Sequence, residues 1–126
     1  MNSAFIYKIL LIPEYEEALH HGRLIGAPID IEDGYIHFST HEQTQETLQK
    51  HFKSRGDVVI LKVSVSALKD EFLRFEKSRN DALFPHYYTI MAMDAVVSTW
   101  SVPMQADGSH HIDNIDEFTK KGPEDD

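Results

Sequence analysis

The pattern of hydrophobic and polar positions predicts five or six strands along the chain. Residues 5–11 and 57–65 are nearly continuous runs of bulky and branched side chains, which is typical of buried strands. Residues 35–39 alternate between apolar and polar positions, as a half-buried strand does. Further strands are predicted at residues 71–78 and 94–102, and residues 79–90 are predicted to be a loop that enters another strand.

Two helices are predicted, both in the N-terminal half. The first begins at Pro13, which suits a first helical turn, and Gly22 is its natural stop. The second begins at Thr40, has Gln43 three positions later in a capping-box arrangement, and runs to about residue 55. Residues 23–34 are predicted to be a loop or an extended connection. Strands with few helical crossovers indicate an α+β fold and not a doubly wound parallel sheet.

Length and composition favour one domain at residues 1–103, followed by an acidic, flexible tail at residues 104–126. The 126 residues are enough for a self-standing core. The formal net charge is −9, and the tail holds seven acidic residues against two lysines. The absence of cysteine excludes disulfides and thiolate metal sites and favours a cytoplasmic location. The apolar run near the N-terminus is too short to span a bilayer and has no basic segment before it, so neither a membrane span nor a signal peptide is predicted.

Charge also narrows the class of partner. No run rich in lysine and arginine occurs in the sequence. General nucleic-acid binding needs a clustered basic surface and is therefore disfavoured. A small phosphorylated molecule needs only one or two well-placed cations, so it remains compatible with this sequence.

Three ionisable residues stand on predicted strands whose neighbours are apolar or aromatic. Lys8 lies inside the first apolar run, His37 is at the centre of the 35–39 strand, and His86 follows a proline at the entrance of a strand. For each residue alone, a sheet margin or a hydrogen bond within the core is the simpler explanation. Occurring together, the three residues favour a shared pocket.

The residues around these positions indicate what such a pocket would bind. Side chains two apart on a strand share a face, so Tyr35 and Ser39 are predicted to point the same way as His37, and Tyr88 the same way as His86. With Tyr7, these tyrosines supply rings for stacking on a base, and the imidazoles supply donors for phosphate or ribose oxygens. The sequence therefore predicts a nucleotide-like ligand.

Eight histidines raise the alternatives of a metal site or a hydrolase. The adjacent pairs at 20–21 and 110–111 diverge on a helix or lie in the tail, and no HExxH spacing occurs. No GxSxG motif is present, so a Ser-His-Asp hydrolase is disfavoured. No resident metal and no required cofactor are predicted, with NAD considered only as a substrate.

Several motifs occur in a specific order: "IYKI" at 6–9, "DGYIHFST" at 33–40 and "FPHYY" at 84–88. On these motifs the chain closely resembles the bacterial domain-of-unknown-function family 952, over residues 4–102. That family is similar in architecture to the ADP-ribosyltransferase-like group, which includes the tRNA 2′-phosphotransferases. The resemblance implies a bent, split antiparallel sheet with two main helices in the N-terminal half.

The resemblance also implies roles for particular residues. Lys8, His37 and His86 take the three polar positions of the ADP-ribosyltransferase-like scaffold, with His86 as a general acid or base. Because His86 stands where protein-modifying transferases carry a glutamate, binding of NAD, ADP-ribose or a related nucleotide, with transfer or hydrolysis of part of it, is favoured over protein ADP-ribosylation. The remaining ligand contacts are assigned to Tyr7, Tyr35, Ser39, Thr40, Tyr88, Glu76 and Arg79.

Two alternatives stay open at this stage. Glu76 and Arg79 either border the site or form an exposed charge pair, and the sequence favours the pair. The protein as a whole is either a nucleotide enzyme or a non-catalytic module, such as a small-ligand sensor or a protein-interaction domain, because a fold does not determine its function. The discriminating feature is whether Lys8, His37 and His86 share one concave site.

Overall fold

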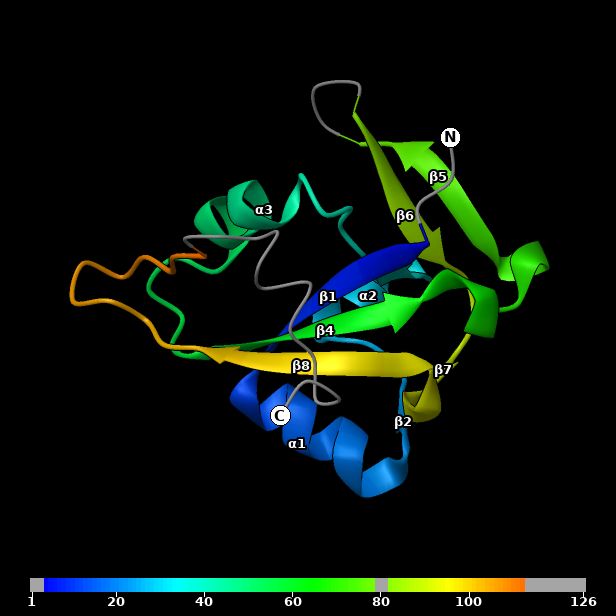
Figure 1. The fold of residues 1–126 in the computed structure, drawn as a ribbon, viewed down its shortest axis with the longest axis horizontal. Helices are drawn as coiled ribbons and strands as arrows, with labels where there is room; N and C mark the ends of the chain where they lie inside the picture. Colours follow the sequence, from blue (N-terminus) through cyan, green and yellow to red (C-terminus); the bar gives the residue numbers. More distant parts are fainter. Residues whose placement is uncertain (1–3, 79–81, 113–126) are drawn as a thin grey trace.

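The computed structural model describes residues 4–78 and 82–112, and these form an α+β arrangement of antiparallel sheets with three α-helices. The largest sheet has the order β1-β4-β8 and is shown across the centre of Figure 1. Its strands are β1 (Phe5–Leu11), β4 (Val58–Ser64) and β8 (Val96–Val102). The α+β class and the antiparallel pairing predicted from the sequence are confirmed.

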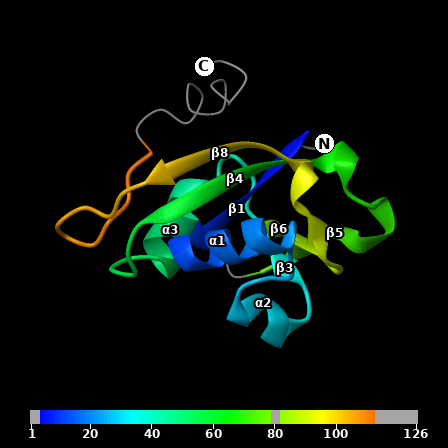
Figure 2. The same ribbon diagram turned by 90° about the horizontal axis from the view of Figure 1, so that it is seen from below.

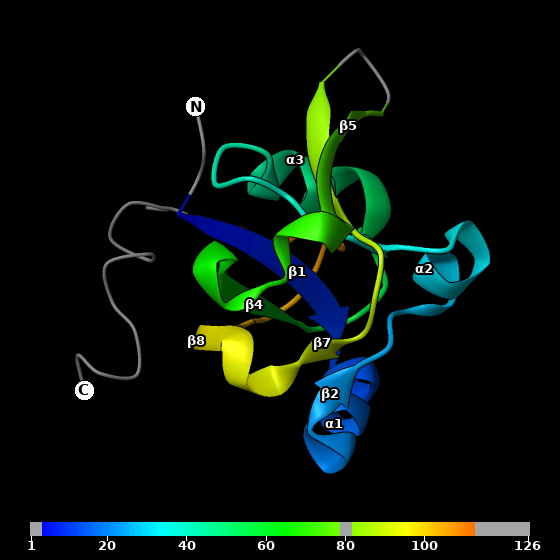
Figure 3. The ribbon, with the colours of Figure 1, turned by 90° about the vertical axis from the view of Figure 1, so that its right-hand side faces the viewer.

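Two smaller sheets complete the strand pairing. One joins β2 (Arg23–Leu24) to β7 (Met91–Ala92). The other has the order β3-β6-β5 and consists of β3 (Ile36–His37), β6 (Leu83–Tyr87) and β5 (Leu73–Lys77). Strands β5 and β6 extend away from the large sheet (Figures 1 and 3). The strands are therefore divided among three antiparallel sheets.

Strand β1 is buried on both of its faces, which explains its nearly continuous apolar sequence. Ile6 and Leu10 belong to one hydrophobic cluster, and Tyr7 and Ile9 belong to another. Lys8 shares the face of Ile6 and Leu10 because it lies two residues from each. The strand therefore carries its lysine into the interior, and only 5% of Lys8 is exposed.

The first helix follows its sequence signals closely. It is α1 (Ile12–His21), and Glu14 accepts a hydrogen bond from the backbone N–H of Leu11 at 2.9 Å. Gly22 ends the helix in a left-handed conformation with φ 73°. The predicted start near Pro13 and the predicted stop at Gly22 are both confirmed.

The prediction of a loop or extended connection at residues 23–34 was wrong in part: β2 is extended, but Pro28–Asp33 form a third helix, α2. The helix has only six residues, too few to show a hydrophobic period in the sequence. The side chain of Asp30 accepts a 2.7 Å hydrogen bond from the backbone N–H of Ala27 and so caps the helix start. Figure 2 shows α2 beyond β3 and β6, on the side away from β8.

The second predicted helix is shorter than expected. It is α3 (Thr44–His51), whereas the sequence predicted a span from Thr40 to about residue 55. Gln43 does accept the predicted hydrogen bond from the N–H of Thr40, at 2.9 Å, but the backbone forms a turn there before the helix begins. The helix cannot continue far because Ser54 has a φ of 64° and its N–H donates to Gly108.

Strand β3 is also shorter than the predicted strand at 35–39. Only Ile36 and His37 pair with β6, and Ser39 forms an isolated bridge with Tyr7 of β1. The segment therefore changes its pairing partner within three residues. It connects the β3-β6-β5 sheet to the β1-β4-β8 sheet, which brings residues from both sheets together.

The described part of the predicted tail, residues 104–112, lies against the body of the domain. His110 is 1% exposed, and its Nε2 is 2.6 Å from the carbonyl oxygen of Gly56. Gln45 of α3 donates to the carbonyl of His110 at 2.9 Å and accepts from the N–H of Ile112 at 3.0 Å. The division into a domain and a tail at residue 103 stays a prediction, and residues 113–126 lie outside the described part.

None of the described helices has both the length and the apolar character that crossing a membrane requires.

Candidate functional site

A cleft of about 680 Å³ lies between β1, α2, α3 and the β3–β6 pair. Its walls include six of the residues that the sequence assigned to a site: Tyr7, Lys8, Tyr35, His37, Ser39 and His86. The volume is in the range that small-molecule sites occupy. The residues come from elements that are far apart in sequence, so the cleft exists only in the folded chain.

Asp30 is the most connected polar residue of the cleft. It is 1% exposed, and its Oδ2 accepts a 2.8 Å bond from Lys8 Nζ. Its Oδ1 is 2.5 Å from Nδ1 of His37 and also accepts from the backbone N–H of His37 at 3.1 Å. With the cap bond from Ala27, Asp30 joins β1, α2 and β3 at a single carboxylate.

The charges of this network follow from burial and pairing. Burial by itself would raise the pKa of Asp30, but its bond to His37 and the nearby Lys8 outweigh burial and lower the pKa to about 2. Burial lowers the pKa of Lys8, although Asp30 acts in the opposite direction. Lys8 Nζ also donates to the carbonyl of His37 at 2.9 Å, so two of its three N–H groups are used inside the protein.

His37 is held by carboxylates at both ring nitrogens. Besides the Asp30 contact at Nδ1, its Nε2 is 2.9 Å from Oδ2 of Asp33, and its side chain is 33% exposed. An ionised carboxylate can only accept hydrogen bonds, so both contacts are made when both ring nitrogens carry hydrogens. His37 therefore presents the edge of its ring to the cleft, together with the exposed carboxylate of Asp33.

His86 lies directly opposite His37 in the β3–β6 ladder. The two ring centroids are 5.5 Å apart, and Tyr35 packs against both rings, at 4.6 Å from His37 and 4.1 Å from His86. Nδ1 of His86 is 2.8 Å from Oε1 of Glu76 on β5. Three aromatic rings thus meet at the wall of the cleft, and the carboxylate of Glu76 is bonded to one of them.

Glu76 receives a second hydrogen bond, from the hydroxyl of Tyr88 at 2.6 Å. Donation to Glu76 is the main reason that the pKa of Tyr88 rises to about 12. Glu76 thus bonds to His86 and Tyr88, and its predicted pairing with Arg79 stays a prediction. Arg79 lies outside the described residues.

The structure brings Lys8, His37 and His86 together, as the sequence predicted. Three other predicted contacts, Thr40, Glu76 and Tyr88, are not among the residues that line the cleft. Within this cleft Lys8 is not an unpaired cation, because it is bonded to Asp30 and to the carbonyl of His37.

Sequence reasoning missed several charged residues of the cleft, among them two aspartates and two cations. Asp30 and Asp33 belong to the stretch that was predicted to be a loop, and Lys50 and Arg55 lie on and after α3. A signal for Asp30 was present, because an acidic residue two positions after Pro28 fits the first turn of a helix. Lys50 and Arg55 are exposed cations on the α3 side of the cleft.

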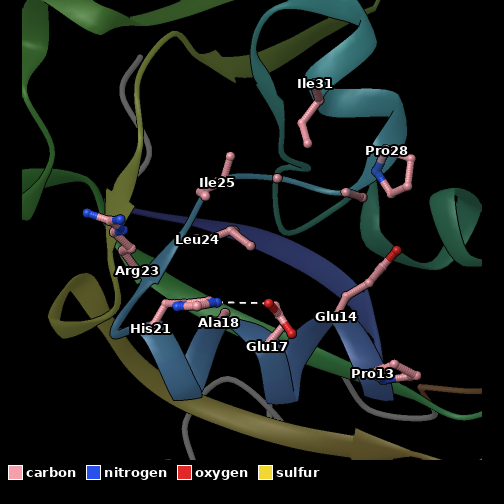
Figure 4. A pocket seen from close by; sticks show the side chains of 12 residues that line it. Pro13, Glu14, Glu17, Ala18, His21, Arg23, Leu24, Ile25, Pro28 and Ile31 are labelled. Carbon is pink, nitrogen blue, oxygen red and sulfur yellow. Dashed lines mark hydrogen bonds and ion pairs between the residues drawn. The ribbon is translucent and has the colours of Figure 1, made fainter.

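A second pocket of about 410 Å³ lies beside the cleft, between α1, β2 and the start of α2 (Figure 4). Its floor is apolar, with Ala18 and Leu24, and the bond between His21 and Glu17 at 2.8 Å lies at its edge. The imidazoles of His37 and His86 are in the larger cleft, so we place the candidate site there. No group of three or more acidic or histidine residues within the described ranges is arranged to hold a metal.

The low pKa of Asp30 predicts a loss of stability in acid. A carboxyl group with a depressed pKa stabilises the folded state above its unfolded pKa of 3.8, and this contribution disappears as pH falls from about 4 to about 2. The change corresponds to about 2 kcal/mol. Urea unfolding at pH 6, 4 and 2.5 measures it, and the same series on Asp30→Asn should be flatter by about that amount. If the unfolding free energy depended on pH equally in both proteins, the low pKa assigned to Asp30 would be contradicted.

Comparison with known proteins identifies the family and structures of similar fold. The family model described as "Protein of unknown function (DUF952)" matches residues 9–99. The crystal structure of protein CC0527 from Caulobacter crescentus is similar, with 38% identity, a TM-score of 0.79, and coverage of 85% of this chain and 93% of that one. The solution NMR structure of CC0527 has 38% identity, a TM-score of 0.73, and coverage of 85% and 91%. Among curated proteins there is no match.

Proposed function

Because the chain belongs to the DUF952 family, whose description assigns no activity, we propose its function from the cleft: it binds NAD⁺, ADP-ribose or a related phosphorylated nucleotide and transfers or hydrolyses part of it. The observation that carries this proposal is the meeting of His37, His86 and Tyr35 in a cleft whose walls also include the cations Lys50 and Arg55. Such a cleft offers rings for a base or ribose and positive charges for phosphates.

The charges and rings of the cleft give the ligand an orientation. The phosphates lie toward Lys50 and Arg55, helped by the remaining N–H of Lys8. The ribose and the reacting bond lie near His37 and His86, with Tyr35 beside them. Tyr7 and Ser39 contact the ligand from the β1 wall, and Thr40, Glu76 and Tyr88 border the site.

The ADP-ribosyltransferase-like relationship is part of the same proposal. It is supported by the order of the polar residues, with Lys8 on β1, His37 on β3 and His86 on β6. Glu76 adds a carboxylate that the late motif itself lacks, because it reaches His86 from the neighbouring strand β5. A cytoplasmic setting, expected from the absence of cysteine, belongs to the proposal as well.

A non-catalytic binding module is the second candidate, and one observation favours it. Lys8 and both ring nitrogens of His37 are already bonded within the protein, as in a network that holds strands together. A module of this kind would bind the nucleotide and release it unchanged. Product analysis by chromatography after prolonged incubation separates the two candidates.

Calorimetry with NAD⁺ and with ADP-ribose tests the proposal. We expect binding to the unmodified protein and at least tenfold weaker binding to Tyr35→Ala, because the loss of a stacked ring costs about 1–3 kcal/mol. His37→Ala should also weaken binding. Tyr15→Ala is a matched control, because Tyr15 packs against the core and is not among the cleft residues. The absence of heat with every such nucleotide would remove this function.

A further inference from the structure

His86 differs from the other two ionisable residues that the sequence placed in the site. It is 4% exposed and lines the cleft, and its Nδ1 is bonded to Glu76. Within residues 4–78 and 82–112, the hydrogen bond of its ring is made at Nδ1, and Nε2 is not among the buried polar atoms that lack a partner. Because His86 lines the cleft, a ligand or water there can complete the hydrogen bonding of Nε2. Nε2 of His86 is therefore the atom through which the protein can meet a ligand.

The state of Glu76 determines which nitrogen of His86 carries the hydrogen. The hydrogen bonds from Tyr88 and from His86 lower the pKa of Glu76, so its carboxyl group is ionised near neutral pH. An ionised carboxylate only accepts, and Nδ1 of His86 must therefore donate. In the neutral ring this leaves the lone pair on Nε2.

The antiparallel ladder of β5 and β6 fixes this geometry. Glu76 pairs with Phe84 and Arg74 pairs with His86, so Glu76 and His86 are diagonal neighbours on one face of the ladder. Tyr35 covers the imidazole with a stacked ring whose plane is tilted by 26°. The ring of His86 is thus held at one nitrogen and on one face.

We propose that Glu76 is the positioning residue of the site, holding His86 with Nδ1 protonated so that Nε2 acts as the general base for the reaction in the cleft. Nε2 takes the proton of a water or acceptor hydroxyl, and the electron pair of that O–H bond stays on the oxygen. With NAD⁺ this oxygen bonds to the ribose carbon as the bond to nicotinamide breaks, and neutral nicotinamide leaves with the electrons of that bond. Tyr88 steadies the carboxylate through its own hydrogen bond to Glu76. The proton transfer to Nε2 rests on the proposed function, whereas the tautomer of His86 does not depend on it.

Nitrogen-15 NMR of the histidine rings in the ligand-free protein tests the state of the ring. We expect neutral His86 to be the Nδ1–H tautomer, and Glu76→Ala to make it a mixture because the acceptor is gone. Glu71→Ala is the matched control, since Glu71 is an exposed glutamate just before β5, and it should leave the His86 signals unchanged. An Nε2–H tautomer in the unmodified protein would overturn the inference, as would an identical tautomer in Glu76→Ala.

Turnover kinetics with NAD⁺ test whether the reaction depends on the Nδ1–H tautomer of His86. Glu76→Gln keeps the shape of the side chain and removes its charge, so we expect kcat to fall at least tenfold with KM nearly unchanged. Glu71→Gln should match the unmodified enzyme. An unchanged kcat in Glu76→Gln would overturn the role of Glu76. If the unmodified protein turns over no nucleotide, the proposed function fails and the NMR result alone decides the inference about His86.

Discussion

Asp30→Ala is expected to lower the free energy of unfolding by about 3–5 kcal/mol, the typical cost of removing one partner of a buried ion pair. The variant leaves Lys8, which is 5% exposed, without its carboxylate. It also removes the acceptor of His37 Nδ1 and the cap of α2 at Ala27. Urea denaturation at pH 7, followed by circular dichroism, measures the change.

The matched control is Glu32→Ala on the same helix. Glu32 is exposed, so its removal should change the free energy of unfolding by less than about 0.5 kcal/mol. A second variant, Lys8→Met with Asp30→Leu, removes both charges at once and should be less destabilised than Asp30→Ala. A loss below about 1 kcal/mol in Asp30→Ala would show that the network does not support the fold.

Gly26→Ala is expected to destabilise the protein by about 3 kcal/mol, and it tests the packing of the same carboxylate. Gly26 has a φ of 130°, which an alanine adopts only with strain of about 1–2 kcal/mol. A Cβ at this position would also stand 2.6 Å from Cβ of Asp30. Overpacking of that kind adds about 1–3 kcal/mol. Thermal and urea unfolding measure the total loss of unfolding free energy. Nucleotide binding should also be weaker in this variant.

Gly34→Ala separates the cost of backbone strain from the cost of overpacking against Asp30. Gly34 has a φ of 89°, and a methyl group on its Cα would meet no atom within 4 Å apart from its chain neighbours, so only the backbone strain applies there. We therefore expect a loss of about 1–2 kcal/mol for Gly34→Ala. Equal losses for the two variants would mean that the contact between Gly26 and Asp30 has no energetic role.

Much of the fold could be predicted because its signals are local. The buried strands β1 and β4 are recognisable by their apolar runs, and α1 has a proline at its start and a glycine at its end. The short elements could not be predicted in the same way. Helix α2 has six residues and β3 has two, and their conformations depend on the contacts of Asp30 and on the pairing of His37 with His86.

In the candidate site, too, some residues could be predicted from the sequence and others could not. Lys8, His37 and His86 could be selected from the sequence because each interrupts an apolar or aromatic strand pattern. Their partners could not be selected. Asp30 lies 22 residues from Lys8, and Glu76 lies 10 residues from His86, so neither pairing leaves a pattern in the local sequence. Lys50 and Arg55 look like ordinary surface cations until the cleft is formed beside them.

The sequence by itself determined the α+β class, the long strands, the first helix and the three ionisable residues, since these follow from the periodicity of neighbouring side chains. The tertiary structure decided which atoms of those residues are free. It assigned Lys8 and His37 to the carboxylates of α2 and left Nε2 of His86 toward the cleft. Hydrogen-bond partners are chosen by distances of about 3 Å in space, and only the packing of β1, α2, β3, β5 and β6 sets those distances.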